Sequence, residues 1–286
     1  MKIAFLGDIH GRIFHTLAVI ATWEQQAKMR LDCVIQVGDF GAYPNPDENL
    51  RNDRFIKQDP TQLDFACLFT ATDGVANRLT TMRRHLNKPV YFVRGNHEDF
   101  TWLDQLRTRT PTSVVPIDPF GLFTYVPDGT VLNVGGFPVA FLGGVETSDR
   151  AAPGAIDDAA YQELYALGPG SIHILVTHDA PYGISTNRSG LLQGSQRIVD
   201  LMAQTQPRYL IAGHYHHRNG PRQYGRTTYL GLNVLVHLDR DNDRQSVEAG
   251  SLAILDTETD QLDVVTDPWL AAIDRDFDFK RFVDQL

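Results

Sequence analysis

Short motifs built from aspartate, asparagine and histidine recur along this chain, each directly after an apolar run. The motifs are Gly7-Asp8-Ile9-His10, Gly38-Asp39, Gly95-Asn96-His97-Glu98, Thr177-His178-Asp179 and Gly213-His214-Tyr215-His216. Carboxylate, amide and imidazole groups are ligands for divalent cations such as Mn, Fe, Co and Zn, and no thiolate is among them. The motifs therefore predict a metal site assembled from distant parts of the sequence, with glycines that let the backbone turn sharply.

The number of potential ligands indicates more than one cation. Seven side chains are candidates, which is too many for one tetrahedral zinc site. The candidates are Asp8, His10, Asp39, Asn96, His178, His214 and His216. Two cations in five- or six-fold coordination would use them all, and one carboxylate can bridge two ions about 3.5–4 Å apart.

The alternative is that each polar residue has a separate and ordinary role. Asp8 could cap the helix that follows it, and His214 and His216 could lie in a solvated turn. Five independent motifs of one kind make that coincidence a poor explanation. The remaining histidines are interpreted as core, cap or surface residues: His15, His85, His173, His217 and His237.

The runs before the motifs read as buried strands. They are short, rich in Val, Ile and Leu, and not alternating, which is typical of strands covered on both faces. They span 2–7, 32–38, 89–95, 172–178 and 208–214. Helices are predicted between them, over 13–29, about 62–86, 100–109, 157–167 and 193–204. Strand–helix alternation indicates parallel βαβ units, whose carboxyl-end turns share one edge, so the motifs should meet in space.

A second group of strands has hairpin signals such as Asp-Gly and Gly-Gly. It covers 124–144, 227–235, 249–257 and 261–267. The two groups together predict an α/β protein with two sheets and helices outside. The polar, Pro- and Asp-rich stretch 43–61 is interpreted as an inserted loop that could serve as a lid. The segment 268–286 is predicted to be an amphipathic helix that docks on the body, with an oligomer contact as the alternative.

Composition restricts the partners and the compartment. The 286 residues carry a formal net charge of −9, which disfavours binding to long nucleic acid. Two cysteines give no disulfide framework and fit the reducing cytoplasm. The first residues are too short an apolar run for a signal peptide, and no window approaches the length of a membrane span. Nothing in the sequence indicates an oligomeric state.

The five motifs, in this order, resemble those of the calcineurin-like metallophosphoesterase superfamily, across residues 7–216. The resemblance implies a four-layer αββα sandwich, here a domain over 1–267 followed by the tail 268–286. It also implies that one metal is held by Asp8, His10, Asp39 and His216. Asp39 would bridge to a second metal, held by Asn96, His178 and His214.

The resemblance also implies a reaction and a role for His97. A hydroxide bridging the metals would attack the phosphorus of a phosphomonoester or phosphodiester. His97 would be the general acid that protonates the leaving group, and Glu98 would either orient His97 or have a surface or cap role. The expected cofactor is a pair of divalent or trivalent ions, with Mn favoured over Fe, Zn, Co and Ni. The expected substrate is a small molecule or a nucleotide.

The sequence says less about the subfamily and the substrate than about the metal site. Arg94 and Asn96 lie where phosphoprotein phosphatases grip phosphate, although Arg94 could equally pair with a nearby carboxylate. Residues 40–43, FGAY, depart from that subfamily and argue against a Ser/Thr phosphatase. The stretch 122–144 and the wording GDFGA are faintly similar to RNA lariat-debranching enzymes, so a debranching enzyme or nuclease is an alternative, and a non-catalytic binding module a more distant one. Further candidates for the pocket wall are Arg188, Arg218 and Arg222.

Overall fold

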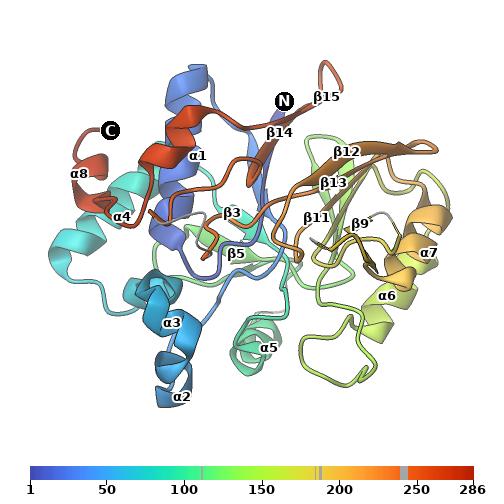
Figure 1. Cartoon of the computed structure of the whole chain (residues 1–286), viewed down its shortest axis with the longest axis horizontal. Helices are drawn as coiled ribbons and strands as arrows, with labels where there is room; N and C mark the ends of the chain where they lie inside the picture. The colour runs from blue at the N-terminus through green and yellow to red at the C-terminus, as the bar shows by residue number, and fades with distance from the viewer. Residues whose placement is uncertain (111, 184, 187–188, 239–243) are drawn as a thin grey trace.

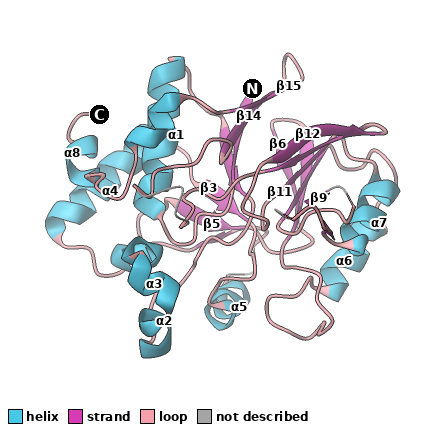
Figure 2. Ribbon diagram, in the orientation of Figure 1, coloured by secondary structure: helices cyan, strands magenta, loops and turns pink. Residues whose placement is uncertain are grey.

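Two mixed β-sheets lie face to face, and helices cover the outer face of each (Figures 1 and 2). The computed structural model describes residues 1–110, 112–183, 185–186, 189–238 and 244–286. The predicted architecture of two facing sheets with helices outside is confirmed. None of the described helices combines the length and apolar character that crossing a membrane requires.

The first sheet has seven strands in the order β15-β14-β1-β2-β3-β5-β4. Strands β1, β2, β3 and β5 run parallel, and the outer pairings are antiparallel. The bounds are β1 Lys2–Leu6, β2 Cys33–Gln36, β3 Val90–Phe92, β4 Val115–Pro116, β5 Phe123–Tyr125, β14 Leu252–Asp256 and β15 Gln261–Val264. The outer face of this sheet is covered by α1 (Ile13–Ala27), α4 (Asp73–Leu86) and α8 (Phe279–Val283) (Figure 1).

The second sheet has six strands in the order β12-β13-β11-β8-β7-β6. Its bounds are β6 Val131–Val134, β7 Phe137–Leu142, β8 Ile174–Thr177, β11 Tyr209–Ala212, β12 Asn219–Tyr224 and β13 Thr227–Gly231. Helices α6 (Asp158–Tyr165) and α7 (Gln196–Thr205) cover its outer face (Figure 2). A small separate hairpin joins β9 (Ser185–Thr186) to β10 (Leu192–Gln193), and α5 (Phe100–Arg109) follows the loop after β3.

The two groups of strands seen in the sequence do not correspond to the two sheets. The apolar strands preceding the motifs are divided, with β1, β2 and β3 in one sheet and β8 and β11 in the other. The hairpin-like strands lie toward the margins of both sheets. The sequence pattern therefore separates strands that precede the motifs from hairpin-like ones, but it does not separate them by burial, because residues 252–255 of β14 are as buried as residues 3–6 of β1.

Alternating residues of β1 show how the central strands are buried. Ile3 and Phe5 pack into the core between the sheets, whereas Ala4 and Leu6 pack toward the helices. All four are fully buried, so the strand has no polar face. The inter-sheet core fixes the position of one sheet relative to the other, and it therefore fixes the edge where the motifs lie.

The stretch 43–61, predicted as an inserted loop, contains short helices. It includes α2 (Glu48–Asn52), α3 (Arg54–Gln58) and the start of a 3₁₀ helix, η1 (Pro60–Leu68). Asp47 accepts a hydrogen bond from the Leu50 N–H at 2.7 Å, and Asp53 accepts one from the Phe55 N–H at 2.8 Å. The acidic residues that suggested a loop are N-caps of short helices. The helix predicted over 62–86 is likewise two elements, η1 and α4.

A buried ion pair ties this stretch to the loop after β1. The Arg12 Nε donates to Asp59 Oδ2 at 2.7 Å, and both residues are almost fully buried. Burial raises the pKa of Asp59, but the charge of Arg12 and the hydrogen bonds from Arg12 and Thr61 together outweigh that effect and lower the pKa. Arg12 follows Asp8 and His10 closely, so this pair joins the inserted stretch to the first motif.

The C-terminal tail is not the single helix expected over 268–286. It forms a 3₁₀ helix, η2 (Pro268–Ala272), and the short α8, with irregular backbone between them. Leu270, Ile273 and Val283 are buried in the core beneath α1 and α4. The carbonyl of Asp274 lies 3.1 Å from His15 Nε2, which fixes the bend between the two short helices.

Replacing Asp59 should reveal how far the inserted stretch depends on its ion pair. Asp59→Ala leaves the buried Arg12 without its carboxylate, and we expect a loss of about 3–5 kcal/mol in the free energy of unfolding. The matched control is Asp284→Ala, which removes the partner of Arg78 on the surface and should change stability far less. Urea denaturation of both variants measures the difference, and equal losses would contradict the assignment.

Candidate active site

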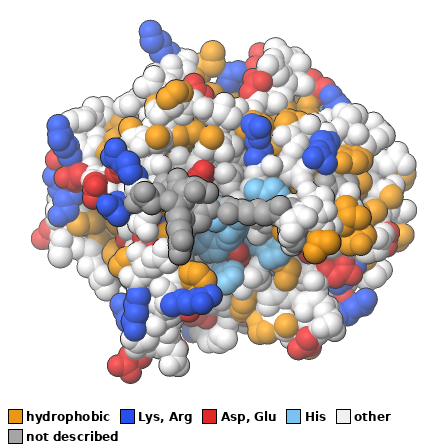
Figure 3. All heavy atoms as spheres, viewed as in Figure 1, with side chains coloured by type: hydrophobic (Ala, Val, Ile, Leu, Met, Phe, Trp, Pro, Cys, Tyr) orange, Lys and Arg blue, Asp and Glu red, His pale blue; other side chains and the backbone are white. Residues whose placement is uncertain are grey.

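The seven candidate ligands converge at the carboxyl ends of β1, β2, β3, β8 and β11. In Figure 3, histidine side chains gather in a hollow near the centre of one face. Two groups have donor atoms that all lie within 4.8 Å of one another: Asp8, His10, Asp39 and His216, and Asp39, His178 and His214. Asp39 belongs to both groups.

The carboxylate of Asp39 lies at the centre of the cluster. Its Oδ1 accepts hydrogen bonds from the Asn96 N–H at 2.7 Å and the His97 N–H at 2.9 Å. The Nε2 of His178 is 3.3 Å from Oδ1, and the Nε2 of His10 is 3.8 Å from Oδ2. One oxygen of Asp39 therefore faces each group of candidate ligands.

The first group has the geometry of ligands around one ion. His10 Nε2 and His216 Nε2 are 3.0 Å apart, and His216 Nε2 is 3.2 Å from Asp8 Oδ2. Two imidazoles that each bind an ion at roughly 2.0–2.1 Å, at right angles, have nitrogens about 3 Å apart. The distance between these two ring nitrogens is therefore compatible with a shared divalent cation as well as with a hydrogen bond.

The second group is oriented by backbone contacts. The Val37 carbonyl lies 3.1 Å from His178 Nδ1, so Nδ1 donates and Nε2 is directed into the site. That Nε2 is 3.1 Å from Asn96 Oδ1, which brings the candidate amide ligand to the same point. The backbone N–H of His214 donates to the carboxylate of Asp8 at 3.0 Å, so the two groups also support each other.

Four of the candidate ligands have a left-handed backbone. The φ angles are 43° at His10, 50° at Asp39, 71° at His214 and 53° at His216. This region is sparsely populated by residues with a Cβ, and such conformations cost about 1–3 kcal/mol each. Because four such conformations occur at one site, we infer that they position these side chains for a function.

The glycines before the motifs act in two ways. Gly38 has a φ of 103°, as a sharp turn requires. At Gly95 and Gly213 the requirement is space, because an added Cβ would lie 2.1 Å from Asp39 Oδ1 and 2.1 Å from Asp8 Oδ1, respectively. These glycines therefore let the backbone of one motif contact the carboxylate of another.

Burial and charge separate the protonation states of the cluster. Burial raises the pKa of Asp39, but the charge and hydrogen bond of His178 outweigh it, and the pKa falls well below its ordinary value. Burial lowers the pKa of His10 to about 3 and that of His214 to about 4. Burial also lowers the pKa of His178, but the charge and hydrogen bond of Asp39, together with Asp8 and the Val37 carbonyl, outweigh it and raise the pKa to about 10, so His178 must lose a proton to bind a cation. Ionised carboxylates and neutral imidazoles are the forms that bind metals.

His97 differs from its neighbours. It is exposed, it belongs to neither group of candidate ligands, and its ring centroid is 5.4 Å from that of His10. Together with His10 and His216 it lines a cavity of about 680 Å³. Its ring can therefore reach a molecule held in that cavity.

Glu98 has a structural role, whereas the sequence left open whether it orients His97 or has a surface or cap role. Its carboxylate is buried and accepts hydrogen bonds from the N–H groups of Phe40 at 2.8 Å, Ala42 at 2.7 Å and Gly95 at 3.2 Å. Burial raises its pKa to about 7, although the backbone N–H groups oppose this. Glu98 thus shapes the loop after Asp39, a role that nothing in the motif GNHE signals.

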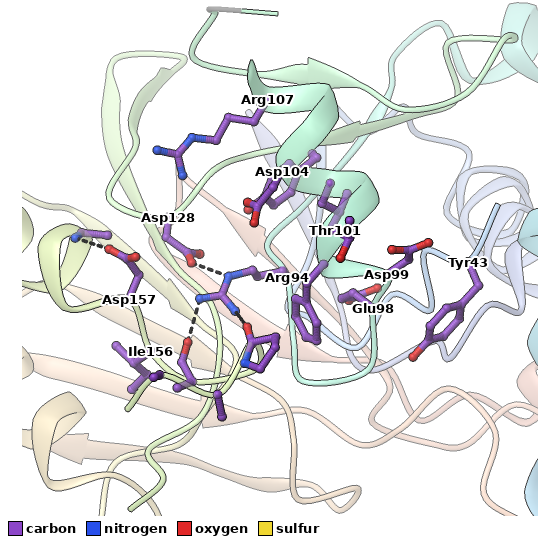
Figure 4. Close-up of a pocket in the computed structure, with 18 of the residues that line it drawn as sticks. Tyr43, Arg94, Glu98, Asp99, Thr101, Asp104, Arg107, Asp128, Ile156 and Asp157 are labelled. Atoms are coloured by element: carbon purple, nitrogen blue, oxygen red, sulfur yellow. Dashed lines mark hydrogen bonds and ion pairs between the residues drawn. The ribbon is translucent and has the colours of Figure 1, made fainter. Parts of the chain in front are cut away.

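Arg94 pairs with a carboxylate, as the second interpretation of this residue proposed. Its Nε donates to Asp128 at 2.6 Å, and its Nη atoms donate to the carbonyls of Pro153 and Ala155 at 2.8 and 2.7 Å (Figure 4). It lines a separate cavity of about 1,040 Å³ that is rich in carboxylates. A contact with substrate phosphate stays a prediction. Of the other arginines, Arg218 and Arg222 line neither of these two cavities, and Arg188 lies outside the described residues.

A family model for calcineurin-like phosphoesterases matches residues 1–218. The chain belongs to this family. Members are metal-dependent phosphoester hydrolases, and the convergent donor groups agree with that class of enzyme. The two facing mixed sheets are the fold that the resemblance implied.

Individual relatives are more distant. A lariat debranching enzyme of Drosophila pseudoobscura pseudoobscura is 25% identical over 254 residues, covering 76% of this chain and 42% of the relative. One from Schizosaccharomyces pombe is 25% identical over 252 residues, covering 76% and 48%. The chain thus spans less than half the length of these curated relatives. A crystal structure superposes with a TM-score of 0.55 at 12% identity, covering 93% of this chain and 99% of the other, and shows the fold alone.

A single methyl group at Gly213 should disturb the metal site. Gly213→Ala places a Cβ against the carboxylate of Asp8, and we expect metal affinity to fall roughly 10–100-fold. Gly168→Ala is the control, because a Cβ there meets no atom within 4 Å. Metal content is measured after dialysis against graded chelator, with circular dichroism to establish folding. Equal metal content in the two folded variants would refute the close contact.

Proposed function

We propose that the chain hydrolyses a phosphoester of a small molecule or a nucleotide at a dinuclear metal centre. Asp8, His10, Asp39 and His216 hold one cation, and Asp39 is shared with a second. The other ligands of the second cation are Asn96, His178 and His214. The observation that carries the proposal is the membership of Asp39 in two separate convergent groups.

The donor set favours borderline divalent cations. The candidate ligands are imidazole, carboxylate and amide groups, with no thiolate. We propose Mn as the bound metal, with Fe, Zn, Co and Ni as alternatives. Bound cations supply Lewis acidity and offset the negative charge of the phosphoryl oxygens. Metal analysis of the purified chain identifies the ions.

His97 is proposed as the proton donor. As the oxygen of water bonds to phosphorus, that water releases a proton to the solvent, the bond from phosphorus to the leaving oxygen breaks, and the leaving oxygen takes a proton from the His97 imidazolium. The exposure of His97 on the cavity beside His10 and His216 supports this role. The hydrogen bond from its backbone N–H to Asp39 fixes its distance from the centre.

A second candidate function is supported by the relatives. They are named lariat debranching enzymes, so a phosphodiesterase that acts on lariats is a specific alternative. The formal net charge of −9 opposes association with long nucleic acid, which favours a small substrate. Hydrolysis of bis-p-nitrophenyl phosphate, p-nitrophenyl phosphate, cyclic nucleotides, dinucleoside polyphosphates and a lariat RNA, compared under one metal condition, decides between them.

The domain limits, the role of the stretch 43–61 and the cellular location are also proposals. We propose one domain over 1–267 with the docked tail 268–286, and a lid role for the stretch 43–61, which contributes to the cavity beside His97. A cytoplasmic location is supported by the low use of cysteine.

Two substitutions should separate proton donation from metal binding. His97→Ala is expected to lower kcat by about 10²–10⁴-fold while the metal content stays that of the wild type. Asp39→Ala should lose both metals and activity, because the carboxylate belongs to both ligand groups. Metal analysis and turnover of the panel substrate that is cleaved best are measured on each variant. A His97→Ala protein with wild-type kcat would exclude the proposed acid.

A further inference from the structure

Two segments of the chain supply most of the lining of the cavity of about 680 Å³ beside the proposed metal centre. One is the α2–α3 segment, and the other is the chain from Val234 to Leu238, after β13. Its open inner end is formed by His10, His97 and His216. Most of the walls are apolar or aromatic, and these residues are Tyr43, Leu50, Phe55, Ile56, Val234, Val236 and Leu238.

Phe55 is the most unusual residue of this lining. Its side chain is a large aromatic group, yet the residue is 48% exposed. The guanidinium of Arg54 lies over the ring, 4.4 Å from its centroid, in a cation–π contact that covers one face. An exposed aromatic ring on the wall of a cavity is suited to stacking against a planar group.

The polar groups of the cavity suit a neutral heterocycle. Asn49 and Gln62 line it; the Gln62 Nε2 donates to the Phe55 carbonyl at 3.1 Å, and an amide oxygen can accept a hydrogen bond from the edge of a nucleobase. Among the described lining residues, Arg12 is the one Lys or Arg, and its guanidinium is bonded to Asp59. The cavity therefore offers little to a second phosphate, which favours a single nucleoside over a polynucleotide.

We propose that this cavity binds the nucleoside part of a phosphoester substrate, with the base stacked on Phe55. The inference rests on the proposed function, because the scissile phosphate must lie at the metal centre for the leaving oxygen to reach His97. The cavity volume lies within the range of small-ligand sites, about 300–1,000 Å³, and is far larger than the volume that a small alkyl substituent would fill. The inserted stretch then determines substrate choice as well as covering the site.

The test compares two ligands that differ only by the base. Binding of adenosine 5′-monophosphate and ribose 5-phosphate to the manganese-loaded chain is measured by titration calorimetry in the His97→Ala background, which should keep the metal but hydrolyse neither ligand appreciably. We expect the nucleotide to bind at least about tenfold more tightly, since stacking of a base on an aromatic ring has an effect of that order. Phe55→Ala should remove most of this preference, and Phe55→Tyr should retain it.

The matched control is Phe69→Ala, a phenylalanine 41% exposed that does not line the cavity. It should leave the preference for the nucleotide unchanged. Equal affinities for the two ligands when Phe55 is intact would overturn the inference, as would an unchanged preference in Phe55→Ala. O-phosphotyrosine binding as tightly as the nucleotide would also overturn it, by showing a general aromatic site.

A further titration separates this inference from the proposed function. Adenosine has no phosphate, and its binding to the chain as purified needs no metal. Phe55-dependent binding of adenosine by a protein that hydrolyses no phosphoester supports the nucleoside site and refutes the proposed function. Hydrolysis of phosphoesters without any preference for adenosine 5′-monophosphate over ribose 5-phosphate leaves the function standing and refutes the nucleoside site.

Discussion

The contacts of the buried Asp39 carboxylate are the constraint on which the site depends. A buried charge is costly unless it is paired and hydrogen-bonded, and here Asp39 accepts two backbone N–H groups and lies 3.3 Å from His178. These contacts join the loop after β2 to the loops after β3 and β8. The same side chain can therefore hold the site together and, as proposed, bridge its two cations.

The two-sheet architecture is what makes that arrangement possible. Asp8, Asp39 and Asn96 follow strands of the first sheet, whereas His178 and His214 follow strands of the second. Neither sheet alone supplies both groups of candidate ligands, so the inter-sheet core determines the distances within the site. Packing that is remote from the chemistry, such as that of Phe5, is in this way part of the site.

The sequence predicted the central strands, most helices and the convergence of the motifs, because buried runs and strand-end residues leave strong local patterns. It did not predict which sheet each strand joins, since pairing depends on contacts far apart in the chain. Nor did it predict the helices of 43–61, where Asp47 and Asp53 are N-caps and not loop residues. The buried role of Glu98 and the left-handed backbone of His214 have no local signal, because tertiary contacts impose them.

Anomalous diffraction from crystals grown with Mn²⁺ tests the central claim most directly, because it locates the ions without reference to activity. The account predicts two manganese peaks roughly 3.5–4 Å apart, with the Asp39 carboxylate between them. One set of histidines and carboxylates should surround each peak. A single peak, or peaks remote from Asp39, would contradict the dinuclear centre.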